Sequence, residues 1–60
     1  MTPELFKGTI FFDKRSNKWA YCKNTRGYTT TYYWYQSIAE NDALRDIRDD
    51  VVTEVDVYTK

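Results

Sequence analysis

The side chains best suited to chemistry in this chain are cations and aromatic rings, and both gather in the first 36 residues. This part carries four more positive than negative charges and ten of the eleven aromatic residues, whereas residues 37–60 carry four more negative than positive charges. Basic groups interleaved with Tyr and Trp are typical of surfaces that bind phosphate backbones. The sequence therefore predicts phosphate contacts from six cations: Lys7, Lys14, Arg15, Lys18, Lys23 and Arg26.

Catalytic and cofactor chemistry is not expected, because the residue types that it needs are missing. The chain has no His, the usual proton shuttle near neutral pH, and a single Cys, Cys22, cannot build a zinc site. Two glycines are too few for a phosphate-cradling loop. Asp49 and Asp50 are adjacent, so on a helix they point in different directions and do not form an acid and base pair. We expect neither an enzyme nor a bound metal or cofactor.

Sixty residues predict one small domain, close to the size at which a single hydrophobic core can still stabilise a fold. No stretch approaches the roughly 18 uncharged apolar residues of a membrane span, and the N-terminal residues lack the apolar run of a signal peptide. One unpaired thiol suits a reducing compartment. These features predict a soluble, cytoplasmic protein that does not bind a membrane.

The spacing of apolar residues along the sequence predicts three strands and then a helix, within a single α+β domain. Strands are expected over about 5–12, 18–23 and 28–36, separated by turns rich in Asp, Ser, Asn and Gly. Ser37 and Glu40 form an S-x-x-E capping box, which predicts a helix over about 38–50. Its expected sheet-facing stripe consists of Ala39, Ala43, Leu44, Ile47 and Val51.

The last ten residues predict a fourth strand over about 51–59, because Val51, Val55 and Val57 alternate with acids. The complete order is βββαβ: a three-stranded antiparallel sheet packed on one helix, followed by a short strand. An unpaired edge of that strand would be a template for binding a partner.

Alternation along the strands also predicts which aromatic residues form the core. Trp19 and Tyr21 are expected in the core because so small a domain needs their area. Phe11, Tyr32 and Trp34 fall on the outer face, where they either bind a partner or pack under other elements. The remaining core positions are expected to be Ile10, Phe12, Tyr33 and Tyr35.

Residues 7–19, which read KGTIFFDKRSNKW, resemble the opening hairpin of the arm-type DNA-binding domains of phage tyrosine integrases. They are also similar to plant ethylene-response (APETALA-type) domains and their relatives in homing endonucleases. Ser37, Glu40 and Ala43 stand where those families have a Ser or Thr and an E-A-rich helix. The resemblance covers residues 6 to about 50 and implies a three-stranded sheet that enters the major groove of double-stranded DNA.

Two functional hypotheses follow. In the first, the protein is a small accessory or regulatory DNA-binding module whose six cations clamp phosphates while Thr30, Tyr32 and Trp34 lie against the groove. It requires those cations to share one exposed side, away from the acids. In the second, the protein is a protein-interaction module, for example a small phage-type inhibitor of a host protein, which docks through exposed Tyr and Trp and an acidic edge strand. A homodimer through the last strand is a further alternative.

Overall fold

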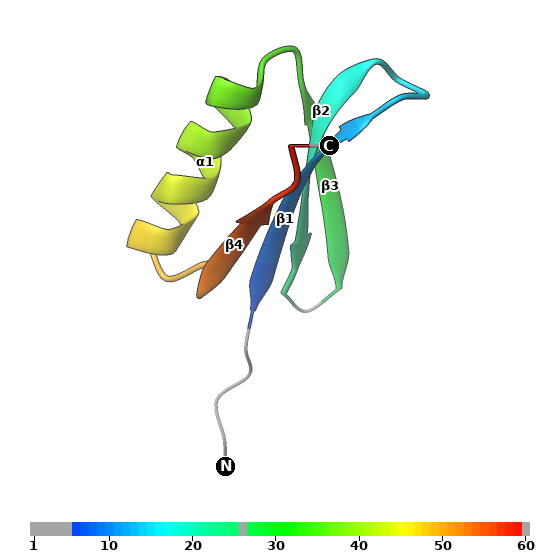
Figure 1. Cartoon of the computed structure of the whole chain (residues 1–60). Coiled ribbons are helices and arrows are strands. Elements are labelled where there is room, and N and C mark those ends of the chain that lie inside the picture. The colour runs from blue at the N-terminus through cyan, green and yellow to red at the C-terminus, as the bar shows by residue number, and fades with distance from the viewer. Residues whose placement is uncertain (1–5, 26, 60) are drawn as a thin grey trace.

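A computed structural model describes residues 6–25 and 27–59, which form one four-stranded mixed sheet with a single helix on one face (Figure 1). The element order is β1 (Lys7–Asp13), β2 (Lys18–Asn24), β3 (Tyr28–Tyr33), α1 (Gln36–Arg48) and β4 (Glu54–Val57). The α+β class and the βββαβ order predicted from the sequence are confirmed. The strands β1 to β3 form an antiparallel meander, because each turn between them spans only a few residues.

The last strand returns across the sheet and pairs in parallel with β1, giving the order β3-β2-β1-β4. The register places Gly8 opposite Val55 and Ile10 opposite Val57. Between α1 and β4, Thr53 ties the chain to the start of β1, because its N–H and its hydroxyl both donate to the carbonyl oxygen of Phe6, at 2.8 and 2.7 Å. This arrangement leaves β3 and β4 as the two edges of the sheet.

The hydrophobic core lies between α1 and the two central strands. Its buried members are Ile10, Tyr21, Ala39 and Ala43, and Trp19, Tyr33 and Val55 pack against them. The expectation that Trp19, Tyr21, Ile10 and Tyr33 face the helix is confirmed. Two of the expected core aromatics are instead exposed, since 42% of Phe12 and 66% of Tyr35 is accessible to solvent.

The helix begins earlier than the predicted capping box requires. Tyr35 is the N-cap with extended backbone, no side chain caps it, and its carbonyl accepts from the N–H groups of Ile38 and Ala39. Ser37 therefore lies inside the first turn rather than at the cap, and Glu40 instead accepts from the Gln36 side-chain amide at 2.9 Å. The predicted capping box is wrong because β3 stops at Tyr33, three residues short of the expected end.

The buried stripe of α1 is narrower and more polar than predicted. Leu44 is 62% exposed, and Ile47 and Val51 are also exposed, whereas Ala39 and Ala43 are buried. The two alanines allow the helix backbone to approach the sheet closely. Asp42 and Asp46, which are not part of the predicted stripe, accept from the hydroxyls of Tyr33 and Tyr21, because a buried tyrosine hydroxyl needs an acceptor.

The helix ends in a Schellman motif (a C-terminal cap with one left-handed residue). Asp50 has a φ of 61°, the Asp50 N–H donates to Ile47 at 3.2 Å, and the Val51 N–H donates to Asp46 at 2.8 Å. Glycine usually occupies such a left-handed position because it has no Cβ. The end of α1 at Arg48 agrees with the predicted stop near residue 50.

Candidate interaction surface

The sheet face opposite α1, here called the open face, carries a cross-strand arrangement of side chains set by the register. Alternation along paired strands places on this face every second residue, starting from Lys7 in β1 and Lys18 in β2. The same rule assigns Tyr28, Thr30 and Tyr32 of β3 and Glu54 and Asp56 of β4 to it. Thr30, Tyr32 and Lys18, three of the predicted contact residues, therefore share one face.

Aromatic side chains form a row across the open face near the β1–β2 turn. Phe11, Ala20 and Tyr32 are direct cross-strand neighbours on β1, β2 and β3. Ala20 has no accessible surface although it belongs to the open face, which is expected if its larger neighbours cover it. Tyr32 itself remains 49% exposed. The row therefore runs across three strands, with Tyr32 accessible to a partner and Phe11 half-buried.

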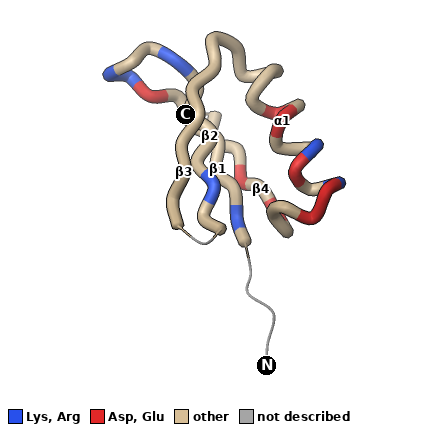
Figure 2. The backbone as a smooth tube through the Cα atoms, turned by 180° about the vertical axis from the view of Figure 1, so that it is seen from behind, with Lys and Arg blue, Asp and Glu red and all other residues tan. Residues whose placement is uncertain are grey.

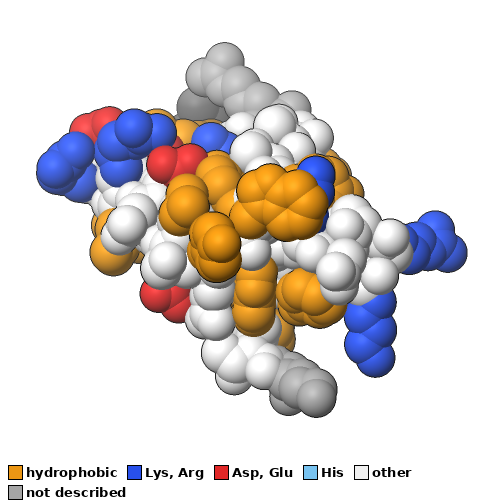
Figure 3. Space-filling view, turned by 90° about the horizontal axis from the view of Figure 1, so that it is seen from above, with side chains coloured by type: hydrophobic (Ala, Val, Ile, Leu, Met, Phe, Trp, Pro, Cys, Tyr) orange, Lys and Arg blue, Asp and Glu red, His pale blue; other side chains and the backbone are white. Residues whose placement is uncertain are grey.

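Trp34 extends this row just beyond the end of β3 and is 68% exposed. The ammonium of Lys18 lies 4.5 Å from the centroid of a Trp34 ring, a cation–π contact between two predicted site residues. Figure 3, which views the molecule from above and not onto the open face, shows hydrophobic side chains in the middle, basic groups at both sides and acidic groups mainly at one side. Sequence reasoning placed Phe11, Tyr32 and Trp34 outside, and the structure agrees.

The five predicted phosphate-binding cations that the structure describes do not gather on one side. Figure 2 shows basic positions at the β1–β2 turn and a separate group at the opposite end of the sheet. At that far end, Lys7 Nζ lies 2.7 Å from Asp56 Oδ2, and the hydrogen bond and charge of Asp56 raise the pKa of Lys7. The expectation that the acids of the last strand stay away from the cations is wrong, because β4 pairs with β1.

Lys23 is placed on the helix side of the sheet rather than on the open face. Its ammonium lies 3.1 Å from Asp46 Oδ2 and 5.5 Å from the centroid of the Tyr21 ring. The Tyr21 hydroxyl donates to the same carboxylate oxygen at 2.9 Å. Lys23 therefore helps to hold α1 on β2. Arg26, the last of the six, lies outside the described residues.

The remaining predicted cations, Lys14, Arg15 and Lys18, lie at the β1–β2 turn. Among the residues that the structure describes, none of the three forms an ion pair with an acid. The Asp13 carboxylate is engaged in the turn itself, where it accepts from the Arg15 N–H at 3.0 Å and from the Ser16 hydroxyl at 3.2 Å. The turn is therefore the one described region where positive charge dominates.

Sequence reasoning missed the two tyrosine–aspartate links between the sheet and α1. Tyr21 donates to Asp46, and Tyr33 donates to Asp42. Burial raises the pKa of Tyr21, with a further contribution from Asp46; burial and then Asp42 raise the pKa of Tyr33 to about 12. The signal for these links was present in the sequence, since Asp42 and Asp46 are four residues apart on the side of the helix that also carries Ala39 and Ala43.

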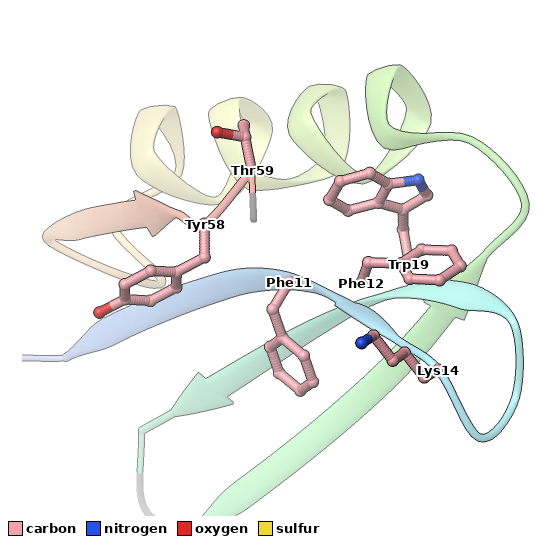
Figure 4. A pocket seen from close by; sticks show the side chains of 6 residues that line it. All are labelled: Phe11, Phe12, Lys14, Trp19, Tyr58 and Thr59. Carbon is pink, nitrogen blue, oxygen red and sulfur yellow. The ribbon is translucent and has the colours of Figure 1, made fainter.

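Sequence reasoning also missed a pocket at the β1 edge, here called the edge pocket. It has a volume of about 610 Å³ and is lined by Phe11, Phe12, Lys14, Trp19, Tyr58 and Thr59 (Figure 4). Phe12 and Trp19 meet edge to face, with ring centroids 5.5 Å apart. Tyr58 follows β4 and approaches from the opposite side of β1, so no local sequence pattern joins it to the hairpin.

Metal and membrane sites find no support in the described part of the chain. No group of three or more His, Cys, Asp or Glu side chains within residues 6–25 and 27–59 is arranged to hold a metal ion. The single helix found there is neither long nor apolar enough to cross a bilayer. Cys22 is a free thiol, partly buried on the open face.

Comparison with known proteins gives no match: no protein-family model, no curated protein and no solved structure is significantly similar to this chain. The resemblance of residues 7–19 to the integrase arm-type and APETALA-type hairpins therefore stays a prediction. The features that bear on function are therefore the open face and the edge pocket.

Proposed function

We propose that this protein is a protein-interaction module that contacts its partner through the aromatic row on the open face. The observation that carries the proposal is that exposed Tyr32 and Trp34 and half-buried Phe11 share a face that α1 does not cover. Large, rigid aromatic side chains supply much of the binding free energy at protein interfaces, and they do so at a low cost in conformational entropy.

The charges of the open face also favour a protein partner over duplex DNA. Lys7 is paired with Asp56, and Glu54 belongs to the same face. The negative charges of β4 therefore balance the positive charges of Lys7 and Lys18 on the open face. A duplex-binding surface must instead present a clear excess of positive charge toward the phosphates. A balanced face with an aromatic centre and a charged rim corresponds better to the general composition of a protein interface.

The test is capture of a partner by the tagged full-length chain, with and without nuclease. One polypeptide should be enriched reproducibly, and nuclease should not release it. The double variant Tyr32→Ser plus Trp34→Ser should lose it, since truncating an aromatic anchor commonly costs at least about 2 kcal/mol, or some thirtyfold in affinity. Tyr28→Ser is the matched control, because it removes a still more exposed tyrosine, 79% against 49% for Tyr32, from the other end of β3. Capture that survives the double variant would refute the proposal.

Nucleic-acid binding is the second candidate, favoured by the unpaired cations Lys14, Arg15 and Lys18 at the β1–β2 turn. Three phosphate contacts would give a slope of log K against log salt of about −2.7. A gel shift with mixed duplex DNA at two salt concentrations measures this slope. Binding with that slope, abolished by Lys14→Glu plus Arg15→Glu, would favour DNA over a protein partner.

A further inference from the structure

Beyond Ile10, one edge of β1 has no partner strand among the residues that the structure describes. β1 continues to Asp13, but its parallel pairing with β4 ends at Ile10 and Val57. The last bond of this ladder runs from the Tyr58 N–H to the Ile10 carbonyl at 2.8 Å. Because backbone groups alternate sides along a strand, the N–H and C=O of Phe12 face the same edge as those of Ile10. Within the described part of the chain, no residue pairs with that edge of Phe12.

The edge pocket lies beside this unpaired backbone. Its volume of about 610 Å³ falls in the range of about 300 to 1,000 Å³ that is typical of ligand sites. Phe12 and Trp19 form one wall, Phe11 points to the opposite side of β1, and Tyr58 lies apart from them beside the end of β4 (Figure 4). Phe12 is 42% and Tyr58 57% exposed, so an apolar group entering here would remove aromatic surface from water.

The rim of the edge pocket carries one positive charge, that of Lys14. The adjacent carboxylate, Asp13, is already occupied by the turn through Arg15 and Ser16. An incoming carboxylate would therefore find an available ammonium group, and Arg15 follows next in the chain. Charge complementarity at this rim points to an anionic ligand with an apolar side chain.

We infer that an extended peptide segment of a partner protein docks in the edge pocket and continues the sheet where β4 ends. Its backbone pairs with Phe12, its apolar side chain packs between Trp19 and Tyr58, and its carboxylate meets Lys14. This is strand addition, in which backbone hydrogen bonds provide affinity and alternate side-chain pockets provide specificity. The inference rests on the proposed function and specifies the chemistry of the partner.

An extended peptide fits the strand edge, the aromatic pocket and the positive rim better than a nucleic acid or a second copy of this chain. A free backbone donor and acceptor on one strand edge match the spacing of another strand, which a nucleic acid does not supply. A second copy pairing through β4 would bring Glu54 and Asp56 close to their own counterparts, and like charges opposite each other are destabilising. Both remain distinct outcomes of the experiment.

The experiment is a two-dimensional amide NMR titration of the full-length chain with acidic hexapeptides. The probes are four peptides that place Val, Leu, Phe or Trp between aspartates, each with an N-methylated twin that has the same side chains but lacks the pairing N–H groups. At about 1 mM peptide, at least one probe should shift the amides of Phe11, Phe12, Lys14 and Tyr58. Its twin should bind at least about tenfold more weakly, because strand pairing is lost.

Two variants locate the site. Lys14→Glu should weaken binding by about tenfold or more, whereas Arg48→Glu, which makes the same charge change on an exposed residue of α1, should have little effect. Three results would overturn the inference: no amide shift with any of the four probes, equal affinity for the N-methylated twins, or shifts produced at the pocket by an octathymidylate instead of the peptides. If sedimentation shows a dimer, and the Phe12 amide signal is lost in that dimer, the edge of β1 at Phe12 would be assigned to a second copy.

Failure of this inference can be separated from failure of the proposed function. Partner capture that depends on Tyr32 and Trp34 but not on Lys14 would leave the open face as the binding surface and remove the edge pocket from it. Loss of both dependences would refute both proposals.

Discussion

Replacing Gly8 by Ala should destabilise the fold, because there is no room for a methyl group at this position. A Cβ on Gly8 would lie 2.6 Å from Tyr21 Cε1, 3.2 Å from the Tyr21 hydroxyl oxygen and 3.2 Å from Val55 Cγ2. The ring of Tyr21 is fully buried, and its hydroxyl is bound to Asp46 on the helix. The ring therefore cannot swing away without breaking the link between β2 and α1.

The expected magnitude follows from two opposing effects. Forcing an extra carbon into a packed core costs about 1 to 3 kcal/mol. Replacing glycine reduces the entropy of the unfolded chain, which returns about 0.4 to 1 kcal/mol. The net loss of unfolding free energy is then about 1.5 kcal/mol, or a decrease in Tm of about 6 to 12 °C for a domain of this size. Urea and thermal unfolding followed by circular dichroism measure both quantities.

Gly27 provides the matched control, because a Cβ there would meet nothing within 4 Å and no described glycine has a positive φ. Gly27→Ala should therefore stabilise the protein by about 0.4 to 1 kcal/mol, because it only reduces the entropy of the unfolded chain. In a Tyr21→Phe background, where the ring is released from Asp46, Gly8→Ala should cost less by about 0.5 kcal/mol or more. Equal effects of Gly8→Ala and Gly27→Ala would refute the packing argument.

Three further predictions concern α1 and its contacts with the sheet. Asp50→Gly should raise the free energy of unfolding in urea by about 1 kcal/mol, because glycine adopts the left-handed backbone without strain. Asp50→Asn should give only the share of this stabilisation that comes from removing a negative charge at the helix C-terminus. Asp46→Ala should cost about 2 to 3 kcal/mol, since it leaves the Tyr21 hydroxyl and Lys23 without their acceptor, whereas Asp49→Ala at an exposed site should cost less than about 0.5 kcal/mol. The pKa of Tyr33 is raised from 10.0 to about 12, so this tyrosine ionises in the unfolded chain first, and the free energy of unfolding should fall as pH rises from 10 to 12. Tyr33→Phe should reduce the slope of unfolding free energy against pH, measured together with tyrosinate absorbance. An unchanged slope in Tyr33→Phe would contradict this prediction.

Local features of the fold were readable from the sequence because they depend on residues close together in the chain. The turns at residues 14–17 and after Asn24, the β-branched and aromatic composition of β3 and the helical period of residues 36–48 each act over a few residues. They were sufficient to predict the βββαβ order, the core roles of Trp19 and Tyr21, and the outward position of Tyr32 and Trp34.

The placement of charge was decided only by the tertiary structure. Nothing within β4 indicates that it pairs with β1, yet this pairing sets Asp56 against Lys7 and ends before Phe12, whose edge no described residue pairs with. The sequence places Asp42 and Asp46 on the Ala39 side of α1, but the tyrosines that they meet are set by the packing of the helix on β2 and β3. Amino-acid pattern determines the strands and the helix through local preferences, whereas ion pairs and pockets depend on which distant segments meet, and that is settled by burial and packing over the whole chain.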